Sequence, residues 1–447
     1  MIGAATCALA GPAAAETMQG ALARAYAGNP QLNSSRAGAR AVDEVVPQAL
    51  SGYRPRAAAS GDAGYTAQDS VIGGRTSNDK YFPRGLGIQI DQNVWSGNRT
   101  VNSVRRADST VLKAREQLRQ AEQSTLLDGS TAYMDVLRDT AILDLRRNNI
   151  EVLAEQVRQT KDRFNVGEVT RTDVAQAEAR LASAHADESL ASANLKGSLA
   201  RYRQSIGVDA KDLSPAQAID ALLPATLEAA VATSQANHPN ILAALHDVDA
   251  AELQVKITEG ELLPTVGLRG TATQRWDYQS SHRDQTQGTV QALVTVPIYE
   301  GGEVYSRVRQ AKETLGQRRL DADQAREQVR ANVVSAWGQL EATKERITAG
   351  QASIKASEIA LNGVREEAKV GQRTTLDVLN AQQELLSVRV ALIQSQRDRV
   401  VASYALLASV GGLSAQKLKL SVAKYDPAVH YEQVRDKWIG LRTPEGN

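Results

Sequence analysis

The strongest constraint on the fold is a nine-residue stretch that occurs twice. Residues 166–174 (VGEVTRTDV) match residues 370–378 (VGQRTTLDV) at a constant separation of 204 positions (371 − 167). The first copy lies within 84–214 and the second within 298–426, and neither span contains a proline. Since proline is the residue that most often interrupts a helix, both spans can be helical on either side of the repeated stretch.

The glycine in each copy explains where the helices end. Gly167 and Gly371 can take the left-handed backbone conformation that closes a helix and that other residues resist. Threonines after each glycine can then cap the next helix; the candidates are Thr170 or Thr172 in the first copy and Thr374 or Thr375 in the second. The sequence therefore predicts two helical hairpins with their tips at 166–174 and 370–378.

The repeat extends well beyond the tips. Asn29-Pro30 matches His238-Pro239 at a separation of 209, and Gly207 matches Gly411 at 204. Agreement over many positions indicates an internal duplication. The predicted organisation is a signal peptide at 1–15, a first repeat of helix, two strands and long hairpin at 16–207, an equatorial linker at 208–225, a second repeat at 226–411 and an equatorial tail at 412–447.

The proline-free spans carry a heptad pattern that combines large and small side chains. Val104, Val111 and Leu118 recur every seven residues, and alanines follow each of them three positions later. The returning helix repeats the rule with Ala177, Ala184 and Ala191. This pattern allows helices to pack closely in a coiled coil. A helix over 98–165 would be about 100 Å long at 1.5 Å per residue, and it must therefore pack along a bundle or a tube.

Four other stretches alternate between apolar and polar residues, which is typical of strands. They are 56–68, 86–94, 265–276 and 290–298, and their connections at 69–82 and 277–288 are polar and predicted to be loops. Stretches of about ten residues are long enough to cross a bilayer as tilted strands. Alternation alone is equally compatible with a soluble sheet that has one solvated face.

If the strands span a membrane, one chain cannot form the pore. Four strands fall short of the minimum of about eight in a closed barrel, and an open edge in lipid leaves backbone groups without hydrogen bonds. Two chains would give a barrel filled by its own side chains, whereas three would supply about twelve strands and a water-filled lumen. We expect the polar face of each strand to line that lumen and the apolar face to contact lipid.

Composition and motifs exclude several other functions. The net charge of +1 gives no basic surface for nucleic acid. The sequence contains neither a nucleotide-binding glycine loop nor a pair of histidines at metal-binding spacing, so no cofactor, metal site or enzyme activity is predicted. Residues 1–15 are small and apolar and end in three alanines, which predicts a secretory signal; without a basic start, an apolar tail is the alternative. Cys7 follows a poor lipoprotein motif, so lipidation is a weaker alternative.

On these residues the chain resembles the TolC family of outer-membrane efflux and export channels. The two tips carry the resemblance, and the tail from Tyr425 to Trp438 resembles the subset that serves type I secretion. The resemblance implies a mainly α-helical fold with a transmembrane β part: a homotrimer in outer-membrane lipid, extending into the periplasm. It also implies docking to an inner-membrane ABC or RND transporter through a periplasmic adaptor, for export of small molecules or proteins. The alternative is a soluble periplasmic coiled-coil adaptor or scaffold without a pore.

The resemblance further implies a gate at the periplasmic end. In this family an arginine of the second tip bonds to a Thr-Asp pair of the first, and the matching positions are Arg373, Thr172 and Asp173. Two acidic rings of the family constriction correspond to Asp377 and Asn380, so only one ring keeps its charge. Three copies of Asp377 around a narrow axis would attract cations.

Other tip residues complete this hypothesis. Ala368 stands where the family has a tyrosine, so one link of the gate is missing and a looser closure is expected. The residues predicted to form the hairpin tips and to dock the adaptor are Val166, Gly167, Val370 and Gly371. Without the resemblance, Arg373 and Asp377 are equally compatible with solvated charges at a helix end.

Overall fold

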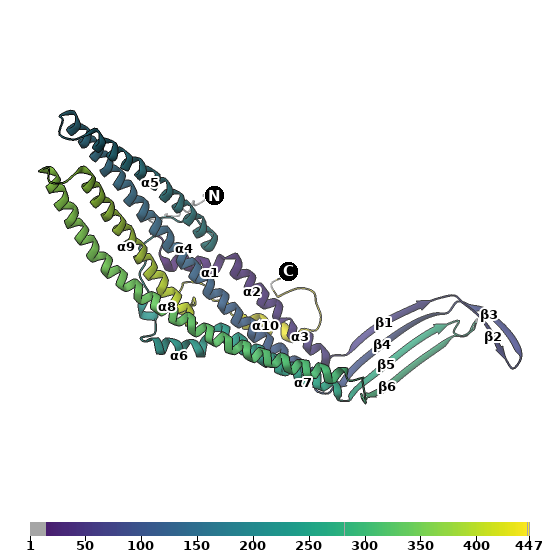
Figure 1. Cartoon of the computed structure of the whole chain (residues 1–447). Coiled ribbons are helices and arrows are strands. Elements are labelled where there is room, and N and C mark those ends of the chain that lie inside the picture. Colours follow the sequence, from purple (N-terminus) through teal and green to yellow (C-terminus); the bar gives the residue numbers. More distant parts are fainter. Residues whose placement is uncertain (1–14, 281, 445, 447) are drawn as a thin grey trace, which may run out of the picture. The chain divides into compact units, whose positions relative to one another are not determined.

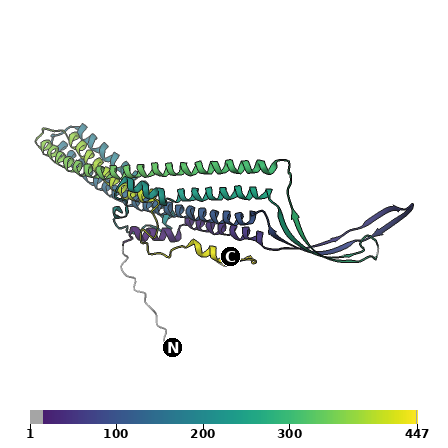
Figure 2. The ribbon, with the colours of Figure 1, turned by 90° about the horizontal axis from the view of Figure 1, so that it is seen from below.

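The computed structural model describes residues 15–280, 282–444 and 446. The predicted signal segment 1–15 and Cys7 therefore lie outside the described residues, apart from Ala15. Contacts divide the chain into two units (Figures 1 and 2). The helical unit comprises the residues up to Arg36, Gln117–Ile241 and Ala325–Tyr425, and the sheet unit comprises Ala37–Glu116, Leu242–Gln324 and the residues from Asp426 onward.

The described elements follow one another in a repeating order of helices, strands and long helices. In the first half they are α1 (Met18–Gly28), α2 (Pro30–Asp43), α3 (Val45–Leu50), η1 (Ser51–Tyr53), β1 (Arg56–Ala63), β2 (Thr66–Ile72), β3 (Arg75–Tyr81), β4 (Arg84–Trp95), α4 (Arg99–Asn165) and α5 (Arg171–Ile206). In the second they are η2 (Asp220–Leu222), α6 (Leu227–Asn237), α7 (Pro239–Glu259), η3 (Gly260–Leu262), β5 (Thr265–Trp276), β6 (Gln285–Thr295), α8 (Glu303–Lys369), α9 (Thr375–Ser409) and α10 (Pro427–Arg435).

The long helices of the two halves have the same length. α4 and α8 contain 67 residues each, which corresponds to about 100 Å at 1.5 Å per residue. The expected helix from 98 to 165 is therefore confirmed. In the helical unit the hairpins α4–α5 and α8–α9 lie side by side, with their tips at the same end (Figure 1).

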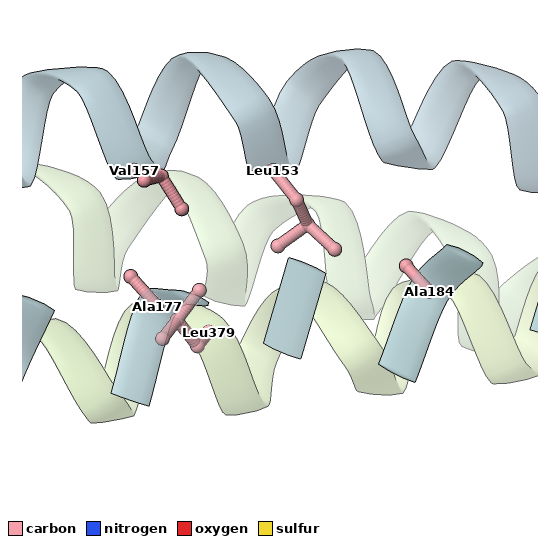
Figure 3. Close-up of a cluster of buried hydrophobic side chains, with 5 residues drawn as sticks. All are labelled: Leu153, Val157, Ala177, Ala184 and Leu379. Atoms are coloured by element: carbon pink, nitrogen blue, oxygen red, sulfur yellow. The ribbon is translucent and has the colours of Figure 1, made fainter. Parts of the chain in front are cut away.

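Small side chains allow the helices of this unit to approach closely, as the heptads predict. Ala177, Ala184 and Ala191 of α5 are all buried. Ala177 and Ala184 pack against Leu153 and Val157 of α4 and, across the hairpins, against Leu379 of α9 (Figure 3). One apolar cluster thus joins the first hairpin to the second near their tips.

The sheet unit contains a four-stranded antiparallel sheet in the order β1-β4-β5-β6. β4 pairs with β1 and, across the two halves of the chain, with β5, which in turn pairs with β6. Ile88 of β4, for example, lies opposite Ala59 of β1 and Ala272 of β5. Within this chain β1 and β6 form the two edges of the sheet.

The register gives the sheet two different faces, because directly opposed residues of antiparallel strands point to the same side. We call one the apolar face; it carries Ala57, Ala59, Leu86, Ile88, Ile90, Val266, Leu268, Ala272, Val290, Ala292 and Val294. The other is the polar face, with Arg56, Ser60, Asp62, Gln89, Asp91, Asn93, Thr265, Arg269, Thr271, Thr273, Arg275, Gln291 and Thr295. The large apolar side chains are exposed rather than covered: Ile88 is 57% and Val290 84% accessible.

Three predictions about the strands are wrong. The last strand, expected over 290–298, is β6 at Gln285–Thr295, so it begins inside the expected loop 277–288 and ends three residues early. The first strand ends at Ala63 instead of continuing to residue 68, and the supposed loop 69–82 belongs to a hairpin of β2 and β3 with Ser70 opposite Ser77. Gly73 and Gly74 form its two-residue turn with φ values of 60° and 80°. Positive φ at both positions is what a tight hairpin turn requires, and glycine meets that requirement without strain. Figure 2 shows this hairpin projecting from the end of the sheet.

A further difference concerns the N-terminal helices. Helices were expected near 22–26 and 42–50, but α2 also fills most of the interval between them. The Asn29 side chain accepts hydrogen bonds from the backbone N–H groups of Gln31 and Leu32 (2.9 and 3.2 Å), and Pro30 occupies the first helical position. Asparagine followed by proline is thus a helix start rather than a break. None of the helices in the described residues is both long and apolar enough to cross a membrane.

Candidate functional site

The two hairpin tips are built in the same way from local sequence. At the first tip, Gly167 has φ 83°, its N–H donates to Phe164 O (3.0 Å), and Glu168 N–H donates to Arg163 O (2.9 Å). At the second, Gly371 has φ 77°, and the corresponding bonds are Gly371 N to Ala368 O (3.3 Å) and Gln372 N to Glu367 O (2.9 Å). Both are the paired closing bonds of a helix that ends in a left-handed glycine.

The return helices begin with identical caps. The Thr170 hydroxyl accepts from Asp173 N–H (3.3 Å), and the Asp173 carboxylate accepts from Thr170 N–H (2.9 Å) and from its hydroxyl (2.7 Å). Thr374 and Asp377 form the same reciprocal box at 3.2, 3.0 and 2.9 Å. Of the candidate caps, Thr170 and Thr374 are therefore confirmed. The bonds from Thr374 hold the pKa of the Asp377 carboxyl below its usual range.

An ion pair bridges the glycine at each tip, with opposite polarity in the two copies. Arg163 before Gly167 pairs with Glu168 after it (3.0 Å). In the second tip, Glu367 lies before the glycine and Arg373 after it, with 2.9 Å between Arg373 Nε and Glu367 Oε2. Exposed pairs of this kind contribute little to stability because solvent screens them, so their main effect is to orient the side chains.

The structure does not bring all of the predicted gate residues together. Within the described chain, Arg373 contacts Glu367 and the Asp173 carboxylate caps its own helix at Thr170. Thr172 is exposed on the first turn of α5. The expected bond from Arg373 to Thr172 and Asp173 is thus not among the contacts of the single chain. The reason is local: each charged group has a partner within six residues on its own tip.

A different pair of side chains links the hairpins at this level. Arg180 of α5 donates from its guanidinium to Asn380 Oδ1 of α9 at 3.0 Å. Further from the tips, Gln382 Nε2 lies 3.4 Å from Asn149 Oδ1 at a buried position. Sequence reasoning found Asn380 but missed Arg180 and Glu367. Glu367 had a signal, since opposite charges flank each glycine, whereas nothing in the local sequence pairs Arg180 with Asn380.

The sheet supplies the second part of the candidate site. On the polar face, Arg269 Nε lies 2.6 Å from Asp91 Oδ1, directly across the β4–β5 pair, and Gln89 donates to the same carboxylate (2.6 Å). Aligned polar rows of this kind suit a water-filled passage. The opposite face presents mostly apolar or small side chains along the same strands, with Gln92, Gln274 and Thr286 as polar exceptions, and such a face is suited to lipid contact. In the described part of the chain, no cluster of three or more histidine, cysteine or acidic side chains is placed to hold a metal ion.

Comparison with known families decides between the functions that the sequence left open. The family model described as "Outer membrane efflux protein" matches residues 21–208 and 230–412. The chain belongs to the outer membrane efflux protein family. One relative resembles it over nearly its full length: the outer membrane efflux protein BepC of Brucella suis biovar 1 is 45% identical over 441 residues, covering 98% of this chain and 95% of BepC.

Two more comparisons extend the result to more distant efflux proteins. The outer membrane protein TolC of Escherichia coli strain K12 is 26% identical over 422 residues, which is 90% of this chain and 84% of TolC. The crystal structure of the CmeC outer membrane channel of Campylobacter jejuni superposes with a TM-score of 0.78 at 16% identity, covering 94% of this chain and 89% of CmeC. The efflux protein described here therefore has the TolC-like fold, and it is an outer-membrane export channel rather than a soluble adaptor without a pore.

Proposed function

We propose that this efflux protein acts as a homotrimer, in which three sheets close one membrane barrel and the helical hairpins form the conduit below it. The observation that carries the proposal is the sheet with two faces and two edges. Backbone groups at the edges β1 and β6 need partners in lipid, where each unpaired group costs several kcal/mol. The β6 edge of one chain and the β1 edge of the next can satisfy each other, and three copies supply about twelve strands.

We propose that the tips dock a periplasmic adaptor, which joins the channel to an inner-membrane ABC or RND transporter. Val166 and Val370 support this role, because each is 72% exposed beside the glycine of its tip. An exposed apolar side chain at the end of a rigid hairpin is suited to a protein contact. The cargo would be small molecules, proteins or both, selected by the transporter. The tubular arrangement itself does not distinguish these cargoes.

We propose that the halves 16–207 and 226–411 are copies of one structural repeat, with 208–225 and 412–447 as equatorial segments. The last part of this tail, from Asp426 onward, belongs to the sheet unit. The matched closing bonds and caps of the two tips support this assignment. Duplication would place two similar hairpins from each subunit in the conduit wall. The two tips differ where their ion pairs reverse polarity, so their roles at the closed end need not be equal.

The gate would form between subunits. Because Arg373 contacts Glu367 on its own tip, we propose that its link to Thr172 and Asp173 joins neighbouring chains in the closed trimer. Asp377 and Asn380 would lie at the constriction, where Asn380 is held by Arg180. Such polar links together need to supply only a few kcal/mol, since opening must be reversible.

Replacing Arg373 with serine is expected to loosen the closed end and raise single-channel conductance several-fold, because the guanidinium that links the tips is lost. The measurement is conductance of the purified trimer in planar bilayers. Arg365→Ser, a change at an exposed position two turns earlier on α8, is the matched control and should conduct like the unmodified channel. Equal conductance in both variants would remove Arg373 from the gate.

Asp377→Asn is expected to weaken cation selectivity. The Asp377 carboxylate is charged at neutral pH, and the bonds from Thr374 lower its pKa further, so the substitution removes three negative charges from the proposed trimer. The measurement is the reversal potential in a salt gradient. Thr374→Ala, which weakens the same cap by about 1 kcal/mol but keeps the charge, separates loss of charge from loss of the cap. A reversal potential unchanged in Asp377→Asn contradicts the role.

The proposal as a whole is tested by two measurements on the detergent-purified protein. Its mass should correspond to three chains, and the particles should form ion-conducting pores when added to planar bilayers. A protein of one chain mass whose strands form a closed sheet without partners would end the proposal, as would a trimer that inserts but never conducts.

A further inference from the structure

The segment after α10 folds into a small closed loop. Lys437 Nζ donates to Arg442 O at 2.5 Å, which joins the two ends of the loop. Gly440 between them has φ 114°, a value that side chains other than glycine rarely tolerate. Arg54 holds the loop from outside, because its guanidinium donates to Lys437 O at 2.8 Å and lies 4.7 Å from the ring centre of Trp438. The loop, residues 437–442, is therefore a defined structural element held by specific contacts; we call it the tail loop.

The tail loop presents its apolar side chains outward. Trp438 is 66% exposed, Ile439 87% and Leu441 102%. Three large apolar side chains within four residues, held by polar contacts at their base, form a concentrated apolar surface that the described residues do not cover. Exposed clusters of this kind mark contacts with proteins or membranes.

The position of the tail loop favours a membrane. Its anchor Arg54 lies two residues before β1, at the end where the strands join the helices, and the Tyr53 carbonyl near it accepts from Gln92 of β4 (3.0 Å). At this same end of β4, Val94 and Trp95 are 59% and 39% exposed. Arg54 thus anchors the tail loop near the end of the sheet at which these apolar side chains are exposed. Figure 1 shows α10 beside α3 in this part of the sheet unit.

The charges around the tail loop also suit a phospholipid surface. Basic residues flank its apolar side chains and outnumber the single acidic residue of the segment 435–442; they are Arg435, Lys437 and Arg442, against Asp436. Arg54 adds a further positive charge where it contacts the loop. Tryptophan and basic residues are the side chains most often found at the level of lipid headgroups. Basic residues near an anionic leaflet add attraction to the burial of apolar surface.

We propose that the tail loop inserts Trp438, Ile439 and Leu441 into the headgroup region of the phospholipid leaflet on the helical side of the sheet. The inference rests on the proposed function, since it takes the sheet as the membrane-spanning part. The loop would fix the depth of the channel in the membrane, with Arg54 transmitting that position to β1. The stated partner is a lipid bilayer that contains anionic phospholipid.

The test uses a fluorescent label on single cysteines in full-length trimers that carry Cys7→Ala. One variant is Ile439→Cys in the tail loop, and the matched control is Glu432→Cys on the exposed side of α10. Both are reconstituted into vesicles of phosphatidylethanolamine and phosphatidylglycerol. We expect the label at 439 to be quenched by a nitroxide placed near the lipid headgroup and to show a several-fold smaller iodide quenching constant than the label at 432.

Each alternative outcome overturns the inference in a recognisable way. Equal iodide quenching at both positions means that the loop stays in water. Protection at 439 from iodide and from the nitroxide alike means that protein covers the loop, and a neighbouring copy of this chain is then the occupant. The conductance of the same vesicles is recorded in parallel. If the channels conduct but the loop is exposed to water, only this inference is wrong. If the vesicles never conduct, the result counts against the proposed function.

Discussion

Replacing Ile88 with lysine should prevent most of the protein from reaching the membrane in a conducting form. Ile88 lies on the apolar face of the central strand β4, between Ala59 and Ala272. A charged side chain on the lipid side of a membrane strand costs about 2–4 kcal/mol near the bilayer centre, and the proposed trimer would carry three copies. Small alanines on both sides offer the new ammonium group no polar partner.

The neighbouring position supplies the control, because side chains alternate between the faces. Gln89→Lys places the same charge on the polar face, where Asp91 is within reach of the residue it replaces. That variant should insert and conduct nearly as the unmodified channel does. The measurements are the share of the protein in the outer-membrane fraction and its conductance after purification. If the two lysine variants insert equally well, the assignment of the faces is wrong.

Gly97→Ala is expected to be the most damaging small substitution in the chain. Gly97 joins β4 to α4 with φ 61°, and a Cβ atom there would lie 2.4 Å from the carbonyl oxygen of Gly260 and 2.8 Å from Leu263 Cβ. Gly260 meets the same obstacle from the other side, since its own Cβ would lie 2.5 Å from Gly97 O. Two backbones in contact cannot move apart without disturbing the junction, so the cost should reach about 4 kcal/mol.

The duplication provides a matched control for this prediction. Gly301 is the counterpart of Gly97 at the same separation of 204 positions (301 − 97), and its φ of 64° is nearly identical. No atom of the described residues lies within 4 Å of a Cβ at Gly301, so Gly301→Ala should cost only the left-handed strain of about 1–2 kcal/mol. The thermal midpoint of the helical circular dichroism and the yield of trimer measure both. Similar losses in the two variants would show that close backbone contact is not what requires glycine at 97.

Local sequence was sufficient for the hairpin tips and the faces of the strands. Gly167 and Gly371 end their helices through bonds to residues three to five positions away, and the caps at Thr170 and Thr374 reach only three positions forward. The faces follow from alternation, which is a property of each strand by itself. The β2–β3 hairpin also depends on local sequence. The pair Gly73-Gly74 could have predicted its turn, but the polar composition of 69–82 suggested a loop instead.

The side-chain partners at the tips could not be predicted from local sequence. Arg373 had possible partners on its own tip and on other tips, and its distance to Glu367 depends on how the chain turns at Gly371. Asn380 was identified by position, but its donor Arg180 lies 200 positions earlier in the sequence. Long-range pairs of this kind depend on which helices pack together and on the rotation of each helix about its axis. The sequence pattern of a single helix predicts neither of these.

The sequence by itself determined the extent of the long helices, the places where they reverse and the apolar and polar sides of the strands, because each depends on residues within a few positions of one another. Tertiary structure decided the strand order β1-β4-β5-β6, the link from Arg180 to Asn380 and the difference between two glycines with the same φ. Gly97 meets the backbone of Gly260 whereas Gly301 meets open space. Identical local conformations thus carry different costs of substitution, since the cost depends on neighbours that only the folded chain brings close.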